Sequence, residues 1–588
     1  MKFYKFTYLL LIVTFFVSTC LFAQQKEIEI KYSGFVDIDE AKNPGARTFI
    51  RDDSQQIHIF HDGIDMWCDQ AIYYEKENFV EAYGNVNVKQ GDSINMNSKY
   101  VEYSGITKLA YASGDVVLTD PTSTIKTDTL YMDREKQQAY YKSGGTVVKD
   151  SSGTITSKIG RYYMSSKKYQ FVQNVKLVNP KYVIDSNQLD YYSETGRAYL
   201  FGPTTITGET STIYCERGFY DTKNDTGYFL KKSRIDYDDR IIEGDSLYFD
   251  RNRSFASATN NIKITDTINK AIIKGHYAEV FRDRDSVFIT KRALAISVQE
   301  NDSIYIHSDT LMVTGKPENR ITRAYYNAKI YKSDISGKSD SIHVNHKTGL
   351  TKLINLSRFS SNDNFAKKRT PVLWNIGNQM TGDTIHLISN PETKKLDSLK
   401  VFDNAFIISN DSLGDGYHQM SGKQLFGFFK ENKLSTIDII KNAESIYYMR
   451  NDKNELVGTD KSKSGIIKIW ITENAIDEVR KIKDVDGNVF PEGDFPEKES
   501  LLRNFVWRDD ERPKSVDDLF KDDPPLELTV IKGLEDYVPQ DEFFDEALMK
   551  RVTESDKKSN SKQSKASRKI PKKPKVGDKS PKKITKQQ

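Results

Sequence analysis

The chain has 588 residues, including 33 Tyr, 30 Phe and 16 Pro, and a formal net charge of +4. This length exceeds what one compact hydrophobic core normally organises. Many aromatic and β-branched residues and few prolines favour strands over helices, so the composition predicts an all-β protein. After the N-terminal segment, no stretch approaches the 18 consecutive apolar residues of a membrane-spanning helix, which argues against a helical membrane protein.

The N-terminus has the pattern of a secretory signal. Lys2 and Lys5 precede an apolar run at 8–17 that is too short for a stable membrane span, and Ala23 offers a small residue for cleavage. We therefore expect residues 1–23 to be a signal peptide and the mature chain to be exported to the periplasm, with attachment to the outer or inner membrane left open. Lipoprotein processing at Cys20 is an alternative, although Thr19 stands where Gly, Ala or Ser is usual.

A short strand motif recurs along the chain, most clearly at 127–133 and 244–250. The first seven copies are 29 or 30 residues apart, and the later steps are 31, 33, 31 and 43 residues. Such regular spacing predicts stacked units in one elongated body, whose working surface is shared by many units. The central residues of the copies are Ile72, Val101, Leu130, Gly160, Leu189, Gly218, Leu247, Ala278, Leu311, Ile342 and Ile385.

Each copy places two apolar residues of the same parity on one face of a strand, because side chains alternate along a strand. A second alternating segment follows, usually entered through Gly, as at 84–88 and 114–118. Short charged links such as 75–78 and 133–136 indicate tight reversals and antiparallel pairing. Stacked units of this kind predict two facing sheets whose apolar inner faces either fill a dry core or line a trough for acyl chains.

The residues expected to line this trough are those of the two alternating segments. They are Ile72, Tyr74, Val86, Val88, Val101, Tyr103, Val116, Leu118, Leu130, Met132, Val175, Leu177, Leu189, Tyr191, Leu247, Phe249, Ile262 and Ile264. The spacing is most uniform between Ile57 and Ile264, so lipid is expected there first.

The changes in spacing and composition predict the organisation of the chain. After the signal peptide we expect a lead-in at 24–56, regular repeats at 57–270, irregular repeats of the same stack at 271–440, a C-terminal cap with short helices at 441–552 and a basic disordered tail at 553–588. The helices are expected at 497–507 and 541–552. Cys68 and Cys215, five repeats apart, are expected to be packed thiols because they lie too far apart for a disulfide.

The end of the chain is strongly basic. Residues 557–588 contain thirteen Lys and Arg and one acidic residue, Asp578, so this tail carries +12 and the rest of the chain −8. Its Ser, Pro and Gln content is typical of a disordered, solvated segment. Two roles stay open, a flexible solubilising end or an electrostatic grip on anionic lipid head groups or cell-wall polymer. Export from the cytoplasm makes nucleic acid an unfavoured partner.

The repeat resembles the OstA/LptA family of periplasmic proteins that move lipopolysaccharide toward the outer membrane. The resemblance lies in an Asp-x-Leu-x-Tyr pattern followed by Ala-x-Gly-x-Val-x-Leu, seen at 69–74 with 82–88 and at 98–103 with 112–118, and it extends over roughly 57–388. It implies an antiparallel, V-shaped β-jelly roll that holds lipid A acyl chains between its sheets. It also implies that the partners are lipopolysaccharide, transport components of the inner and outer membranes, and further copies of the chain stacked end to end.

The function expected from this resemblance is binding and transfer of lipid, without catalysis and without a cofactor. No nucleophile elbow, P-loop or zinc-protease motif appears in the sequence. His58 with His61, and His343 with His346, have a spacing that points to opposite faces of a strand, so no metal site is expected. The Gly-Asp-Ser triplets lack the denser glycine spacing of calcium-binding solenoids.

One alternative of another class stays open, an extracellular β-solenoid that acts as an adhesin or as a polysaccharide-processing enzyme. A parallel solenoid of that kind often carries aromatic ladders and acidic clusters on its outer face. The charged reversals within each unit favour antiparallel arms instead.

Overall fold

The computed structural model describes residues 26–149, 153–299, 302–356, 370–393, 395–411, 413–451, 453–473 and 475–531. The expected signal peptide, Cys20, the helix expected at 541–552 and the basic tail lie outside these residues. The chain divides into a unit of residues Met1–Val530 and a unit of Ile531–Gln588. The architecture described below is that of the first unit.

This unit is made of strands, with a few 3-10 turns. The strands of its first half are β1 (Glu29–Tyr32), β2 (Phe35–Asp37), β3 (Ala46–Ile50), β4 (Ile57–His61), β5 (Ile64–Cys68), β6 (Gln70–Tyr74), β7 (Phe79–Gln90), β8 (Ile94–Ser104), β9 (Leu109–Asp120), β10 (Ser123–Asp133), β11 (Gln138–Tyr141), β12 (Gly145–Lys149), β13 (Gly153–Ser157), β14 (Ile159–Tyr163), β15 (Lys168–Asn179), β16 (Tyr182–Tyr192), β17 (Arg197–Gly208) and β18 (Ser211–Asp221).

The strands of the second half are β19 (Thr226–Tyr237), β20 (Arg240–Asp250), β21 (Phe255–Asp266), β22 (Ala271–Phe281), β23 (Ser286–Ser297), β24 (Ile304–Thr314), β25 (Ile321–Lys332), β26 (Ile335–Asn345), β27 (Leu350–Ile354), β28 (Val372–Asn375), β29 (Asn378–Thr381), β30 (Thr384–Ser389), β31 (Leu396–Asn410), β32 (Tyr417–Lys430), β33 (Lys433–Arg450), β34 (Leu456–Thr472), β35 (Ala475–Ile482) and β36 (Asp486–Pro491). The 3-10 turns are η1 (Arg282–Arg284), η2 (Pro317–Asn319), η3 (Glu497–Glu499), η4 (Asp509–Glu511) and η5 (Asp517–Phe520).

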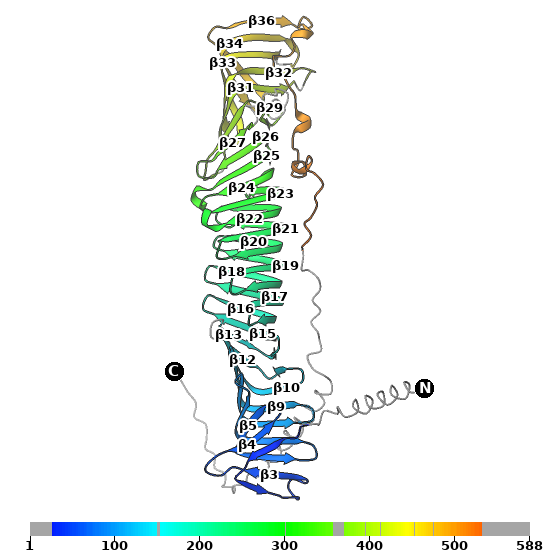
Figure 1. Ribbon diagram of the computed structural model, residues 1–588. Helices are drawn as coiled ribbons and strands as arrows, with labels where there is room; N and C mark the ends of the chain where they lie inside the picture. The colour runs from blue at the N-terminus through cyan, green and yellow to red at the C-terminus, as the bar shows by residue number, and fades with distance from the viewer. Residues whose placement is uncertain are drawn as a thin grey trace, which may run out of the picture. The chain divides into compact units, whose positions relative to one another are not determined.

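The strands pair with their neighbours in sequence, and every pairing between described strands is antiparallel. From β15 to β26 each strand pairs with the one before it and the one after it, so two strands make one repeat. Figure 1 shows these strands following one another along the unit. The predicted all-β class and antiparallel pairing are confirmed.

Bulges in the middle of alternate long strands, such as β7 and β15, bend the sheet. In β15 the register shifts between Val172 and Val175, and the two residues between them, Gln173 and Asn174, have φ values of 65° and 51°. The same left-handed pair occurs in β7 at Gly84 and Asn85, with φ values of 73° and 45°. A bulge of this kind bends a strand sharply, so the two halves of each strand belong to two different arms of the sheet.

We call these halves the first arm and the second arm. In β9 and β10 the first arm contains the pair Ala112 and Leu130, and the second arm contains the pair Val116 and Thr127. Each alternating segment that we expected to be a separate strand is therefore one half of a longer, bent strand. The link at 75–78 is a turn between strands, as predicted, and the link predicted at 133–136 is a turn at 134–137.

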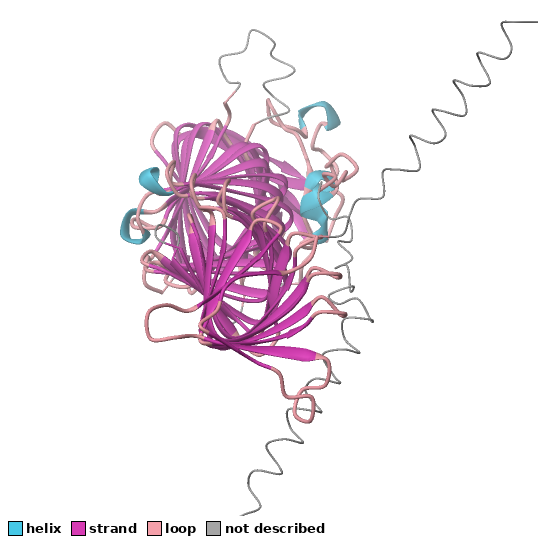
Figure 2. Cartoon of the chain, turned by 60° about the horizontal axis from the view of Figure 1, so that its bottom comes forward, coloured by secondary structure: helices cyan, strands magenta, loops and turns pink. Residues whose placement is uncertain are grey.

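The inner faces of the two arms form one continuous apolar core that runs from Ile28 to Ile469. Figure 2, which looks partly along the unit, shows the strands curving around this common interior. Cys68 and Cys215 are buried free thiols within the core, as predicted. Burial raises the pKa of each thiol to about 12, which keeps both protonated and unreactive at neutral pH.

One repeat copy carries a glycine, Gly160, because a large side chain fills the space beside it, and Gly145 adjoins the same side chain. A Cβ at Gly160 would lie 2.4 Å from Cζ of Tyr141, and a Cβ at Gly145 would lie 2.6 Å from the same atom. Tyr141 is 2% exposed, and its hydroxyl is 2.7 Å from that of Ser157. The glycine thus makes room for an aromatic ring from a neighbouring strand.

The outer face of the first arm carries a row of aromatic rings on successive strands. Tyr83 and Tyr100 lie 4.9 Å apart, Tyr111 and Tyr131 lie 5.0 Å apart, and Tyr131 and Tyr140 lie 5.0 Å apart. Cross-strand aromatic pairs of this kind stabilise a sheet by about 0.2–1 kcal/mol each.

The strand ladder continues to Pro491, well beyond the boundary predicted at 440. The prediction of a helix at 497–507 is wrong, because only the 3-10 turn η3 forms there among the described residues. Tertiary packing overrides the local helix preference, because Leu502, Phe505 and Trp507 pack against the strands. Residues 495–530, the C-terminal strap, instead run back along the stack, as Figure 1 shows.

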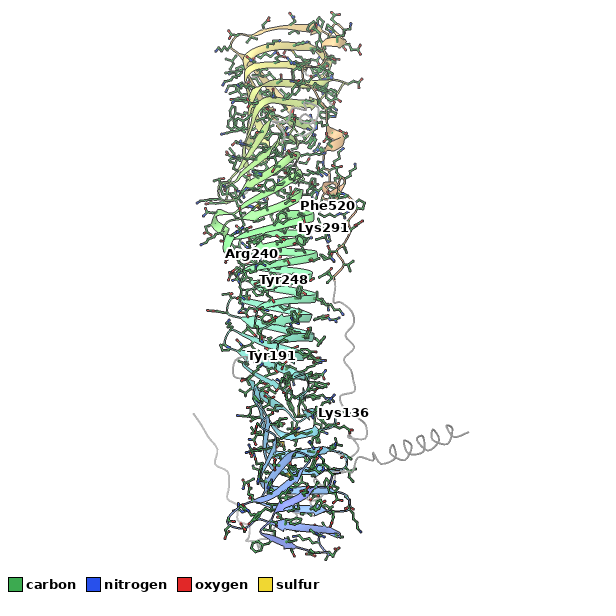
Figure 3. The ribbon with its side chains drawn as sticks, viewed as in Figure 1. Lys136, Tyr191, Arg240, Tyr248, Lys291 and Phe520 are labelled. Atoms are coloured by element: carbon green, nitrogen blue, oxygen red, sulfur yellow. The ribbon has the colours of Figure 1, made fainter. Side chains whose placement is uncertain are left out.

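The strap is held by buried polar side chains that project from the strands. Gln419 donates to the carbonyl of Ser500 at 2.7 Å, Gln379 donates to that of Val506 at 2.7 Å, and Lys329 donates to that of Leu519 at 3.0 Å. Nearer the end of the strap, His307 lies 2.9 Å from Asp523, and Asn260 donates to the carbonyl of Thr529 at 2.8 Å. Figure 3 shows Phe520 of the strap beside Lys291 on this side of the unit.

Candidate functional site: the space between the two sheet arms

Most of the residues expected to line the trough lie on the inner faces of the arms. Those in the continuous core are Val86, Val101, Tyr103, Val116, Leu118, Leu130, Met132, Val175, Leu177, Leu189, Tyr191, Leu247, Phe249, Ile262 and Ile264, and Val88 packs against them. None of the fifteen core members is more than 9% exposed. In this conformation the inner faces therefore pack against each other as a closed core over most of the unit.

The prediction for Ile72 and Tyr74 is wrong about the face of the strand. In β6, Ala71 pairs with Ala82 and Tyr73 pairs with Val80, and all four of these residues belong to the core. Since side chains alternate, Ile72 and Tyr74 point to the opposite face. The motif copy at 69–74 is shifted by one residue relative to the pairing, and a shift of one residue exchanges the two faces of a strand.

Several inner residues escaped the sequence analysis because they lie in the other half of each bent strand. They include Met96, Ile125, Tyr169, Phe171, Ile184, Leu200, Ile213, Phe229, Ile242 and Ile273. These residues could have been found from the alternation of apolar and polar side chains, if it had been counted inward from the turn at each end of a strand. The bulge interrupts that alternation, so the two halves of a strand must be counted separately.

The strand ends opposite the bulges meet at the mouth, which we define as the line of turns where the two arms face each other. Polar side chains join the arms there. His61 lies 2.7 Å from the hydroxyl of Tyr103, Lys149 donates to the carbonyl of Ser193 at 2.6 Å, and Arg282 donates to the hydroxyl of Tyr237 at 2.9 Å. The partners are 42, 44 and 45 residues apart in sequence.

A cavity with a volume of about 120 Å³ lies between the arms, at the mouth between β21 and β27. Its apolar wall includes Ile264, Ile273, Val287, Ala295 and Ile306. This cavity borders the irregular repeats, whereas the sequence placed lipid first between Ile57 and Ile264. A smaller cavity of about 40 Å³ near the N-terminal end is lined by four of the expected residues, Val88, Val101, Tyr103 and Met132.

The polar end of the larger cavity is dominated by Arg320, which is 4% exposed. Its guanidinium forms an ion pair with Asp266 at the end of β21, and Asp239 lies 3.9 Å away. Burial lowers the pKa of Arg320, the charge of Arg240 lowers it further, and Asp239 opposes both. Arg320 follows η2 on the first arm, and Asp266 ends a strand of the second arm, so this pair also joins the two arms.

The histidines that share a strand have partners within the protein. His58 lies 2.7 Å from Asp65 and stacks on Trp67, while His61 contacts Tyr103. His346 lies 2.9 Å from the hydroxyl of Thr322.

Among the described residues, no helix is both long and apolar enough to cross a bilayer.

Comparison with known proteins supports the family resemblance for part of the chain. A solved structure of LptH from Pseudomonas aeruginosa, described as the LptA-homologous periplasmic component of a lipopolysaccharide transport device, is 14% identical. That match covers 24% of this chain and 82% of LptH, with a TM-score of 0.14, so it adds nothing to the fold seen in the strand pairings. No curated protein matches the chain. The family model described as OstA-like protein matches residues 25–187, so this part of the chain is similar to OstA-like proteins.

Proposed function

We propose that the chain is a periplasmic carrier or bridge that holds the acyl chains of lipopolysaccharide between its two arms and passes the lipid toward the outer membrane. The observation that carries this proposal is the continuous apolar interior shared by both arms from Ile28 to Ile469. The OstA-like match at residues 25–187 supports it, because it covers the first repeats of the same stack.

The free energy of apolar burial favours both the binding of a lipid and its movement along the stack. A methylene moved from water into an apolar interior gains about 0.8 kcal/mol, so several acyl chains are held firmly. Successive repeats present nearly the same pairs of inner residues, such as Leu189 with Tyr191 and Leu247 with Phe249. A lipid that moves from one repeat to the next changes its surroundings little, so it can slide, while its direction is set by other components.

The packed interior adds one requirement, because the arms must separate for a chain to enter. The contacts named above across the mouth are made by polar side chains, some part-buried and some buried, whereas the bulges form the corner between the two arms. Opening at the mouth therefore breaks few bonds and leaves the antiparallel ladder intact. Lipopolysaccharide transport components of the inner and outer membranes, and further copies of the chain, are the expected partners at the two ends.

The alternative of a parallel β-solenoid is not supported, since all pairings between the described strands are antiparallel. The aromatic row on the outer face, a feature that such solenoids share, lies here on an antiparallel sheet. A role as adhesin or polysaccharide-processing enzyme would then need a site outside the interior.

The proposal is tested by photo-cross-linking in cells that produce the protein. A photoreactive residue at Leu130, Leu247 or Val116 is expected to capture lipopolysaccharide, because these positions face the interior. The adjacent outward positions Val117 and Tyr248 are matched controls. Tyr73 and Tyr74 make a second matched pair, in which only the inward Tyr73 is expected to capture lipid.

Two results would contradict the proposal. One is that no inward position captures lipopolysaccharide although the variants fold. The other is that outer-membrane assembly continues unchanged when the protein is depleted.

A further inference from the structure

Three buried polar atoms near the mouth of the 120 Å³ cavity make no hydrogen bond within the described part of the chain. They are Nη2 of Arg320, Nε2 of Gln299 and Oδ2 of Asp239. Nη2 of Arg320 and Oδ2 of Asp239 face each other at 3.9 Å, beyond hydrogen-bond distance. Buried polar groups are almost always paired, so the two donors, Nη2 and Nε2, indicate a ligand with acceptor oxygens. Arg320 and Gln299 line the cavity, and Asp239 lies beside Arg320.

The cavity behind these atoms is apolar and is built by both arms. Ile273, Ala295 and Ile306 come from the second arm, while Val287 and Val313 come from the first arm. A space with an apolar wall and polar groups at its entrance suits an amphiphile whose chain points inward.

We propose that this cavity is a binding site for a single alkyl chain that carries an acidic oxygen head group, a carboxylate or a phosphate monoester, with Arg320 as the head-group ligand. We call it the mouth site and define it by Arg320, Gln299, Asp266 and Asp239. It rests on the proposed function, because it locates one chain of such a ligand between the same two arms.

The two unpaired donors decide the chemistry of the head group. In Arg320, Nη1 pairs with Asp266, Nε donates to the carbonyl of Gly315 at 3.4 Å, and Nη2 lies 3.9 Å from Asp239. A carboxylate or phosphate that replaces Asp266 can accept two parallel bonds, from Nη1 and Nη2. Nε2 of Gln299 supplies a further donor, and Arg240 adds a positive charge at the cavity wall. Asp239 and Asp266 oppose an anion, so the ligand must replace Asp266 on Arg320.

This replacement connects head-group binding to opening of the arms. A cavity of about 150 Å³ holds a six-carbon ring, so the 120 Å³ present here accepts only a short chain while the arms stay together. The Arg320–Asp266 pair joins the arms, and a head group that takes over Arg320 releases it. Longer chains are then admitted, and affinity is expected to rise about fourfold for each added methylene.

The site is tested by calorimetric titration of the full chain with octanoate and with octyl phosphate, each below its micelle concentration, and with octyl glucoside as the neutral probe. Both acids are expected to bind, and comparison of the two identifies which head group is preferred. Arg320→Gln is expected to weaken both at least tenfold. Arg282→Gln is the matched control, since Arg282 also joins the arms but does not line the cavity.

A second variant tests the site without changing Arg320, so the test does not depend on whether Arg320→Gln folds. Ala295→Phe fills the apolar wall and is expected to abolish binding of both acids while Arg320 stays in place. The mouth site is overturned if Arg320→Gln binds as tightly as the unmodified chain, if Arg282→Gln loses as much affinity, if Ala295→Phe binds normally, or if octyl glucoside binds as well as the acids.

Failure of the mouth site and failure of the proposed function give different results. Octanoate binding that depends on Arg320, together with no lipid cross-link at Leu130, Val116 or Leu247, would defeat only the carrier function. Lipid cross-links at those positions, together with binding that ignores Arg320, would defeat only the mouth site.

Discussion

Lys181 and Asp225 form an ion pair of 3.4 Å across the mouth, although they are 44 residues apart in sequence. Ser123 and Tyr169 meet in the same way with an offset of 46 residues. Both offsets are about one and a half repeats. The mouth is therefore closed by repeated polar contacts whose partners belong to different units. Some involve an exposed side chain, such as Lys181, and others are buried, such as Ser123 with Tyr169.

Charge reversal at Lys181 is expected to open the mouth locally. Lys181→Glu places a carboxylate beside Asp225, whereas Lys181→Met only removes an exposed ion pair worth about 0–1 kcal/mol. Hydrogen exchange at 180–182 and 222–225 is expected to speed up in the Glu variant and to change little in the Met variant. Raising the salt from about 0.1 M to 1 M should reduce this difference, because screening shortens the range of the repulsion. Equal exchange in both variants would contradict this account.

Gly160→Ala is expected to destabilise the unit by about 1–3 kcal/mol, the usual cost of overpacking a core. The added methyl would lie 2.4 Å from Cζ of Tyr141, whose ring is almost fully buried. Gly208→Ala is the matched control, since the nearest atom to its methyl would lie at 3.4 Å. Urea unfolding measures both. The same transition midpoint in both variants would show that Tyr141 does not require the glycine.

Gln379→Leu is expected to loosen the strap without unfolding the stack. Gln379 is fully buried, and its amide donates to the carbonyl of Val506 and accepts from the N–H of Arg508, both at 2.7 Å. Each backbone group left without a partner costs about 1–3 kcal/mol. Hydrogen exchange at 500–508 should accelerate while the core strands stay protected. Gln424→Leu, on the first arm of β32, is the matched control and should leave the strap unchanged.

Acidification is expected to release the strap near Glu511. Burial by itself raises the pKa of Glu511, but the hydrogen bond and charge of Arg508, together with Lys338, outweigh it and lower the pKa to about 2. Because the pKa is lower in the folded state, this contribution to stability is complete above about pH 4.5 and is lost as the pH falls toward 2.

Pepsin cleavage between Leu519 and Phe520 provides the measurement, since Leu519 is fully buried while the strap is docked. Relative to a free peptide of the same sequence, cleavage should increase between pH 4.5 and 2. Glu511→Gln should already be cleaved at pH 4.5 and should respond less to pH. A flat profile in the unmodified chain would rule out Glu511 as the group responsible.

The strand content, the repeat and the turns were predictable because they depend on local patterns. Alternation over five residues identified Leu130 and Met132 as neighbours on one face, and charged links marked the reversals. The face of β6 was not predictable in the same way. Ile72 and Ala71 are both apolar, and only pairing of Ala71 with Ala82 decides which of them faces the core.

The repeat and the alternation of apolar side chains are enough to predict a stacked antiparallel β-protein with apolar inner faces. The position of the mouth, the cavity that opens there and the path of the strap are visible in the folded chain alone. Arg320 meets Asp266 across two arms, and Asn260 meets Thr529 across 269 residues. Such contacts depend on the bend at each bulge and on the twist accumulated over many strands, and no local pattern records either quantity.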